Sequence, residues 1–215
     1  MGHHCQSWSS CPLKVITFVT DDRYKAMAFG LKASAESFGL ECSILERADT
    51  GSWYKNCNLK CEVILEALEN GGDEPIIWND ADCRYVGKPA LFNELNSYDL
   101  AAVFLNGDHH PFGGTLWFNG KRALPYVKAW AANVRRFPEH EEDSINFRTA
   151  LRRIRPRNIY HLPPAYCWRE YDMKSALPTV QPVIIHTTSG THNYPVTRLG
   201  DDDINRLYAA SSQVN

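Results

Sequence analysis

The sequence contains no apolar run of about 18 residues, the length that a membrane-spanning helix needs. Its 215 residues carry a net charge of −2, so the overall charge gives no indication of a polyanionic partner. Residues 1–12 are polar and lack the apolar stretch of a secretory signal peptide. From these absences we expect a cytoplasmic protein.

Two common cofactor motifs are also missing. The seven cysteines include no C-x2-C pair, which argues against a zinc site of the usual spacing and favours reduced, structural thiols. No G-x-G-x-x-G follows the first predicted strand, so a Rossmann oxidoreductase is disfavoured. With 44% hydrophobic residues, the chain has enough apolar material for one domain with a buried core.

Short apolar runs alternate with helical patterns in the first half of the chain. We predict strands at residues 14–20, 42–45 and 75–78, because these runs are short, apolar and bounded by polar or glycine residues. Between them, residues 24–38 and 58–72 place apolar side chains at helical spacing. This order predicts an α/β domain with a mostly parallel central sheet and helices on its faces.

The second half of the sequence is more mixed. We predict a loop at 106–114, helices at 124–134, 144–154 and near 204–209, and strands at 100–105, 115–118, 159–162 and 182–186. No repeat or linker divides the chain. We therefore expect one domain over residues 14–194, an N-terminal extension over residues 1–13 whose order the sequence leaves open, and a C-terminal tail over residues 195–215.

Two carboxylates follow the third predicted strand. Asp80 and Asp82 form a D-x-D motif there, and ligands of open α/β sheets bind beyond the carboxyl ends of the strands. Carboxylate oxygens suit Mg²⁺ or Mn²⁺, which can also bridge two phosphates. The motif alone is weak, since Asp201 and Asp203 repeat it in the tail without a preceding strand. The position after a strand favours a metal role for the first pair over a turn-capping or solvated pair.

Several segments together resemble one enzyme family. In chain order they are VTDDRY, a helix that carries Lys60, IIWNDADCRY, GGTLWFN, HEEDSINF and VIIH, and they are similar to GT-A nucleotide-diphospho-sugar transferases over residues 14–194. The resemblance implies a single Rossmann-like GT-A domain. It also implies transfer of a sugar from a nucleotide-diphosphate sugar, with a UDP-sugar favoured, to a hydroxyl acceptor, with Mn²⁺ or Mg²⁺ as cofactor.

The resemblance further implies which residues meet the donor and the metal. The base and ribose would lie at Thr20, Asp21 and Tyr24, the donor phosphates at Lys60 and Asp80, and the sugar beside a small-residue turn at Gly113 and Gly114. The metal ligands would be Asp80, Asp82 and His186. A structural alternative stays open for each of these residues. Thr20 can cap a helix, Tyr24 can pack in the core and Lys60 can be solvated on its helix. The glycine pair can form a plain hairpin turn, and His186 can be a core histidine.

Acidic residues precede the helix predicted at residues 144–154. By the same resemblance, Glu142 and Asp143 correspond to the acid that many GT-A enzymes place near the acceptor. Such an acid serves as general base in an inverting enzyme and orients the acceptor in a retaining one. The implied ligand His186 favours a retaining enzyme. Helix starts also attract acids through capping and the helix dipole, so a purely structural explanation stays open.

Arginines gather on the same predicted helix and just after it, at Arg148, Arg152, Arg153 and Arg155. A basic stripe there could bind the phosphates of a nucleic acid or an anionic glycan, and a solvated face paired with nearby acids is the alternative. The acceptor classes left open are a glycan, a protein and a hydroxymethylated base of phage-type DNA, the last in a host cytoplasm. We also expect loop aromatics to line the acceptor cleft, namely His109, His110, Tyr166 and Trp168.

Two other functions stay open. A sugar nucleotidyltransferase also uses a nucleotide, a metal and aspartates, but it usually opens with a glycine-rich basic loop, and here the first strand is followed by DDRYK. In a non-catalytic carbohydrate- or nucleic-acid-binding domain, Asp80 and Asp82 would be structural. Metal-dependent binding of a nucleotide-sugar distinguishes a transferase from the binding domain.

Overall fold

A computed structural model describes residues 13–105, 110–136, 143–155, 157–169, 173–174 and 177–187. The expectations for the N-terminal extension, for the C-terminal tail and its short helix, and for Glu142 and His109 lie outside these residues. Among the described residues, no helix has both the length and the apolar character needed to cross a bilayer.

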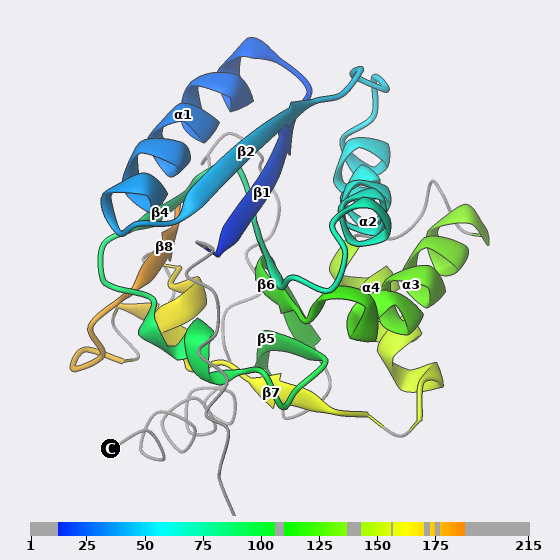
Figure 1. The fold of residues 1–215 in the computed structure, drawn as a ribbon. Helices are drawn as coiled ribbons and strands as arrows, with labels where there is room; N and C mark the ends of the chain where they lie inside the picture. Colours follow the sequence, from blue (N-terminus) through cyan, green and yellow to red (C-terminus); the bar gives the residue numbers. More distant parts are fainter. Residues whose placement is uncertain are drawn as a thin grey trace, which may run out of the picture.

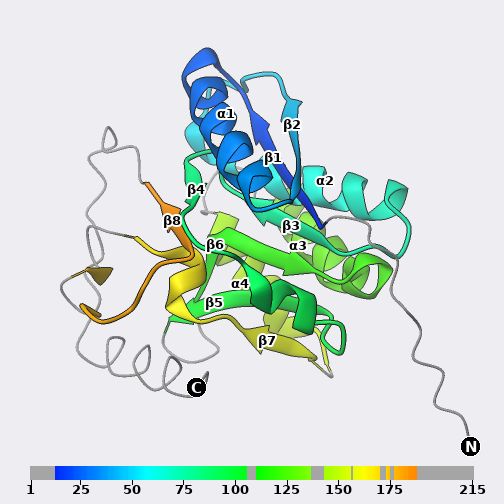
Figure 2. The ribbon, with the colours of Figure 1, turned by 60° about the vertical axis from the view of Figure 1, so that its left-hand side comes forward.

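The centre of the molecule is a six-stranded sheet with the strand order β2-β1-β3-β6-β5-β7 (Figure 1, and Figure 2 for the label of β3). β1 is parallel to β2 and β3, β5 is parallel to β7, and β6 is antiparallel to both of its neighbours. The prediction of a mostly parallel sheet is therefore confirmed. The strands are β1 Lys14–Val19, β2 Glu41–Glu46, β3 Ile76–Asn79, β5 Leu100–Leu105, β6 His110–Phe118 and β7 Ile159–His161.

The two faces of this sheet are buried by different elements. Successive residues of a strand point to opposite faces, so Val15 packs with α1 on one face while Ile16 packs with three other helices on the other. α1 (Asp22–Ser37) covers the first face, and α2, α3 and α4 lie together on the second (Figure 1). The bounds of these three are Trp53–Asn70, Leu124–Arg136 and Asp143–Arg153. Burial on both faces explains why the strands are apolar runs rather than alternating patterns.

The α2 helix begins earlier than the sequence predicts. Its first residue is Trp53, because the Ser52 side chain accepts a hydrogen bond from the Lys55 backbone N–H and so caps the helix. The prediction placed the start at Asn58, where the aliphatic spacing becomes regular. Buried residues of α2 include Asn58 and Lys60, two polar side chains that face the other helices rather than solvent.

The strand β6 is longer than predicted and corrects one assignment. Gly113 and Gly114 were expected in a turn, but both lie inside β6. The hydrogen-bonded ladder to β5 continues as far as the pair Leu105–His110, so the strand runs through the glycines. A glycine pair indicates a turn in a sequence. Here the two glycines lie inside the strand, where the register between β5 and β6 shifts, and the Asp80 N–H donates to the Gly114 carbonyl from the other side.

A second, two-stranded sheet lies beside the first (Figure 2). It joins β4 (Cys83–Tyr85) to β8 (Ile184–His186) in antiparallel register, with Cys83 opposite His186. β4 contacts α1, and β8 contacts the short 3-10 helix η4 (Pro164–Cys167). The sequence analysis predicted β8 as part of a longer strand and missed β4. This small sheet brings a late segment of the chain back to the end of β3.

Candidate functional site

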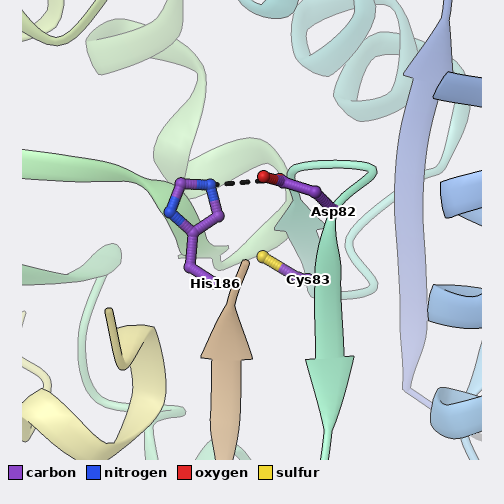
Figure 3. A group of neighbouring side chains, drawn as sticks. All are labelled: Asp82, Cys83 and His186. Atoms are coloured by element: carbon purple, nitrogen blue, oxygen red, sulfur yellow. Dashed lines mark ion pairs between the residues drawn. The ribbon is translucent and has the colours of Figure 1, made fainter. Parts of the chain in front are cut away.

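Three predicted metal ligands come together where β3 ends. Asp80 and Asp82 follow the last residue of β3, and His186 is the last residue of β8. The Nε2 atom of His186 lies 3.1 Å from Asp82 Oδ1 and 3.4 Å from Asp80 Oδ2. Figure 3 shows the His186 ring pointing at the Asp82 carboxylate from the neighbouring strand. Two carboxylates and one imidazole nitrogen therefore face a common point at the edge of the sheet.

Backbone contacts on both sides fix the loop that carries these aspartates. The Asp80 N–H donates to the Gly114 carbonyl on β6 at 3.0 Å, and the Thr187 N–H donates to the Asp82 carbonyl at 3.1 Å. The Trp78 indole N–H donates to Asp80 Oδ1 at 2.9 Å. These bonds hold the two carboxylates in place before any ligand binds.

Lys60 is the central cation of the site. Its ammonium lies 2.8 Å from Asp80 Oδ1 and 2.5 Å from Asp143 Oδ2, and it donates to the Gly113 carbonyl at 3.1 Å. An ammonium has three N–H donors, so these three partners occupy all of them. The Lys60 side chain is only 6% exposed. It therefore joins the D-x-D loop to Asp143, the first residue of α4, across the interior of the protein.

A chain of buried amides aligns the helices on which these residues lie. Asn133 on α3 donates to Asn146 on α4 at 2.6 Å, and Asn146 donates to Asn58 on α2 at 3.1 Å. All three side chains are almost completely buried. Asn58 lies two positions before Lys60 and Asn146 three after Asp143, so the amide chain supports the register in which the lysine and the carboxylate meet.

The opposite charges in the site shift the pKa values of its members. Burial by itself lowers the pKa of Lys60, but the carboxylates of Asp143 and Asp80 outweigh it and raise that pKa above its ordinary value. Burial raises the pKa of Asp80, whereas Lys60 and His186 lower it by more, and the net pKa falls below the ordinary range. Burial lowers the pKa of His186, but Asp82 and Asp80 raise it well above 6.5. In the absence of a metal, the site is thus a cluster of three carboxylates, from Asp80, Asp82 and Asp143, around one lysine and one histidine whose charged forms they favour.

Gly113 and Gly114 leave room for the side chains of the site. A Cβ atom at Gly113 would lie 2.9 Å from Asp143 Oδ2 and 3.0 Å from Lys60 Nζ. At Gly114 it would lie 3.1 Å from Cys167 Sγ and 3.3 Å from the His186 ring. The described structure therefore gives a packing reason for both glycines that does not involve a turn.

Two overlapping sets of side chains could hold a metal ion. The predicted set of Asp80, Asp82 and His186 offers carboxylate oxygens, which suit Mg²⁺ or Mn²⁺, and an imidazole nitrogen, which favours Mn²⁺ of these two ions. A second group, Asp82, Cys83 and His186, has ligand atoms that all lie within 4.8 Å of one another. Cys83 is not predicted from the sequence as a ligand, because only the pairing of β4 with β8 places its thiol beside His186. Its position directly after the D-x-D motif was the one available signal.

Comparison of the fold with solved structures identifies its architecture, whereas the sequence matches no protein-family model and no curated protein. A glycosyltransferase involved in the glycosylation of the major capsid of PBCV-1 matches with a TM-score of 0.65 at 13% identity, over 95% of this chain and 100% of that chain. The apo-form glycosyltransferase GlyE of Streptococcus pneumoniae matches with a TM-score of 0.59 at 14% identity, over 94% of this chain and 60% of that chain. The galactosyltransferase LgtC, in complex with donor and acceptor sugar analogs, matches with a TM-score of 0.58 at 11% identity, over 92% and 96%.

This chain has the GT-A fold. At this level of identity the likeness establishes the architecture, as the sequence resemblance had implied. Within the GT-A fold, the convergence of Asp80, Asp82 and His186 lies beyond the carboxyl end of the parallel strand β3, where open α/β sheets bind their ligands.

The three residues expected at the base and ribose lie at the end of β1 and the start of α1. Asp21, not Thr20, caps this helix of the GT-A domain, since its side chain accepts a hydrogen bond from the Tyr24 backbone N–H at 2.8 Å. The Tyr24 ring packs against Val19, Ala28 and Ala81. Ala81 separates the two aspartates of the D-x-D motif, so Tyr24 lies next to the loop that carries them.

The arginines of the GT-A domain differ in their surroundings. Arg148 is half-buried, whereas Arg152 and Arg153 are exposed in the last turn of α4. Arg155 donates to the Ile154 carbonyl at 2.8 Å and so contributes to the end of the helix. The expectation that aromatic residues line a cleft is wrong for two of them, because they pack in the core: Tyr166 is 7% exposed and Trp168 is 5% exposed. His110 lies at the start of β6.

Proposed function

We propose that this protein is a metal-dependent glycosyltransferase that moves a sugar from a nucleotide-diphosphate sugar, a UDP-sugar in the favoured case, to a hydroxyl acceptor. The observation that carries the proposal is the meeting of Asp80, Asp82 and His186 at one point of a GT-A fold, with Nε2 3.1 and 3.4 Å from the two carboxylates. The two carboxylates fit Mn²⁺ or Mg²⁺, and the imidazole nitrogen of His186 favours Mn²⁺ of these two ions.

Asp80 and Asp82 would supply oxygen ligands and His186 a nitrogen ligand to the cation. The bound cation would neutralise charge on the departing diphosphate as a Lewis acid. Lys60 holds Asp80 through a 2.8 Å ion pair, so the carboxylate is oriented in advance. All three N–H donors of Lys60 are engaged by protein partners. We therefore assign Lys60 as a positioning residue for Asp80 and Asp143 rather than as a direct ligand of the donor phosphates.

Asp143 is our candidate for the acid on the acceptor side, with the neighbouring Glu142 as its alternative. Its side chain is 14% exposed and is held by Lys60 at 2.5 Å. A carboxylate fixed in this way can accept a hydrogen bond from a sugar or acceptor hydroxyl, and so orient it. His186 as a metal ligand favours a retaining course of transfer.

Thr20, Asp21 and Tyr24 are our candidates for the base and ribose, because they follow β1, the parallel neighbour of β3. On the acceptor side, a cationic surface of Arg148, Arg152, Arg153 and Arg155 favours an anionic acceptor. A glycan, a protein and phage-type DNA all remain as acceptor classes for this surface. The PBCV-1 neighbour is described as acting in the glycosylation of a capsid protein, which keeps protein acceptors among them.

The first experiment measures thermal stabilisation by UDP, GDP, CMP and dTDP, each with and without Mn²⁺. A nucleotide at about 100 times its dissociation constant stabilises the native state by about 2.7 kcal/mol. We expect a shift with one nucleotide only when Mn²⁺ is present, and release of that nucleotide from its sugar donor when an acceptor is added.

Two variants test the assignment of the site. The double change Asp80→Asn with Asp82→Asn should remove the metal-dependent shift and the transfer activity while the protein stays folded. Asp73→Asn is the matched control, since Asp73 is an exposed acid in the turn that precedes β3, at the opposite end of the strand from the site, paired with Lys121 at 3.6 Å. Full transfer activity in the double variant would exclude the metal assignment. No shift with any nucleotide would favour a binding domain.

A further inference from the structure

Cys83 lies against the cation site through the pairing of two short strands. It stands directly opposite His186 in the antiparallel ladder of β4 and β8. Residues opposite each other in such a ladder project to the same face, with Cβ atoms about 5 Å apart. Figure 3 shows the sulfur of Cys83 beside the imidazole ring, next to the Asp82 carboxylate. The thiol is completely buried and donates to the Gly114 carbonyl at 3.3 Å.

The ligand atoms of Asp82, Cys83 and His186 are close enough to share one ion. All three lie within 4.8 Å of one another, and the Asp82 and His186 atoms are 3.1 Å apart. Ligands at about 2.0 to 2.3 Å from a tetrahedral zinc ion lie about 3.3 to 3.8 Å from each other. A side-chain movement of about 1 Å therefore closes this group around a cation.

Sulfur in this group changes the kind of metal that it prefers. The set of two carboxylates and one imidazole has oxygen as its main ligand type and suits Mn²⁺, whereas a set with one thiolate, one imidazole and one carboxylate favours softer ions such as Zn²⁺ or Cd²⁺. We propose that Asp82, Cys83 and His186 form a second coordination mode of the site, which binds a thiophilic divalent cation. On binding, the metal–sulfur bond replaces the S–H bond, and the thiol proton passes to the buffer.

The two modes exclude each other, because both need Asp82 and His186. A thiophilic cation in the second mode therefore displaces Mn²⁺ from the mode that also uses Asp80. This competition concerns the ions that the site binds, whether or not the protein transfers sugars. It goes beyond the proposed function and can be tested without a donor or an acceptor.

The test uses the full chain and Cd²⁺ alone as the probe. Cd²⁺ bound by a thiolate has a sulfur-to-metal charge-transfer absorption in the ultraviolet, which oxygen and nitrogen ligands do not give. We expect this band in the wild-type protein, and we expect added Cd²⁺ to release bound Mn²⁺, as measured by electron paramagnetic resonance of the free Mn²⁺. Because the sequence also contains Cys5 and Cys11, all samples carry serine at both positions, and the protein with these two changes alone serves as the wild-type reference.

Cys83→Ser is the decisive variant. It should lose the band and bind Cd²⁺ about tenfold or more weakly, because even residues outside the ligand shell change metal affinity by about 10- to 100-fold. Its Mn²⁺ affinity should stay within about threefold of the wild type, since Cys83 is not in that ligand set. Cys42→Ser, a change at another buried thiol, is the matched control and should keep the band. Cys83→Ala serves as a second variant if the serine variant does not fold.

Three outcomes overturn the proposal. They are a wild-type protein without the band, a Cys83→Ser variant that keeps the band while Cys167→Ser also keeps it, and a Cys83→Ser variant that keeps the band while Cys167→Ser loses it. The last result would assign the sulfur ligand to Cys167, which also lies near His186 across Gly114. Failure of the glycosyltransferase assignment is a separate result, because it shows in the nucleotide and transfer assays and leaves the Cd²⁺ band unchanged.

Discussion

Replacing Lys60 with methionine removes the cation that lies between two carboxylates. The ammonium is 2.8 Å from Asp80 and 2.5 Å from Asp143, and the lysine side chain is only 6% exposed. Breaking a buried pair by removing one partner costs about 3 to 5 kcal/mol, because the remaining charge stays buried without compensation. The Asp80 side chain is 26% exposed and also faces His186, which favours the lower end of this range. We therefore expect Lys60→Met to lower the free energy of unfolding by about 3 kcal/mol.

The assay is urea and thermal unfolding followed by the fluorescence of the six tryptophans, at neutral pH and without metal. For a chain of this length, about 3 kcal/mol corresponds to a fall in the melting temperature of roughly 6 to 12 °C. Lys25→Met is the matched control. Its ion pair with Glu46 has the same 2.5 Å distance, but the two side chains are 40% and 68% exposed. Solvent screens such a pair, so this variant should unfold like the wild type.

A double variant tests whether the missing charge of Lys60 causes the loss of stability. Adding Asp143→Asn to Lys60→Met removes one of the two uncompensated carboxylates. The double variant should therefore lose less stability than the sum of the two single changes. A Lys60→Met protein that unfolds like Lys25→Met, or strictly additive losses in the double variant, would refute the view that this ion-pair cluster holds the site together.

Three further predictions follow from the same geometry. Neighbouring carboxylates raise the pKa of His186 well above 6.5, so a metal must displace a proton from its ring. The Mn²⁺ affinity, measured by calorimetry, should therefore rise by up to about tenfold per pH unit between about pH 6 and pH 8. The His186→Gln variant should lose this pH dependence. Asn146→Ala removes the buried hydrogen bonds that Asn146 donates to Asn58 and accepts from Asn133, and we expect the free energy of unfolding in urea to fall by about 1 to 3 kcal/mol. Gly114→Ala places a methyl group 3.3 Å from the His186 ring and should weaken Mn²⁺ binding, whereas Gly87→Ala, with its nearest contacts at 3.4 Å, should not.

Local pattern was sufficient for much of the framework. Apolar runs and helical spacing predicted β1, β3, α1 and the mostly parallel sheet, because each element has its own hydrophobic period. The D-x-D motif directly follows β3, as predicted. The predicted bounds of β6 and α2 were wrong, because contacts with residues outside the apolar pattern determine the local structure there. The pair Gly113-Gly114 has the composition of a turn but lies inside β6, where the register to β5 shifts. Ser52 starts α2 before the aliphatic pattern of that helix begins.

The residues at the site could be named from the sequence, but their partners could not. By itself the sequence determined the elements and the polar residues at the end of β3, because hydrophobic period, caps and strand ends are properties of neighbouring residues. Only the tertiary structure paired Cys83 with His186 and brought Lys60 to Asp143, which is 83 positions away along the chain. The physical reason is that strand register and helix packing depend on which surfaces of the whole chain are buried together, and no single segment contains that information.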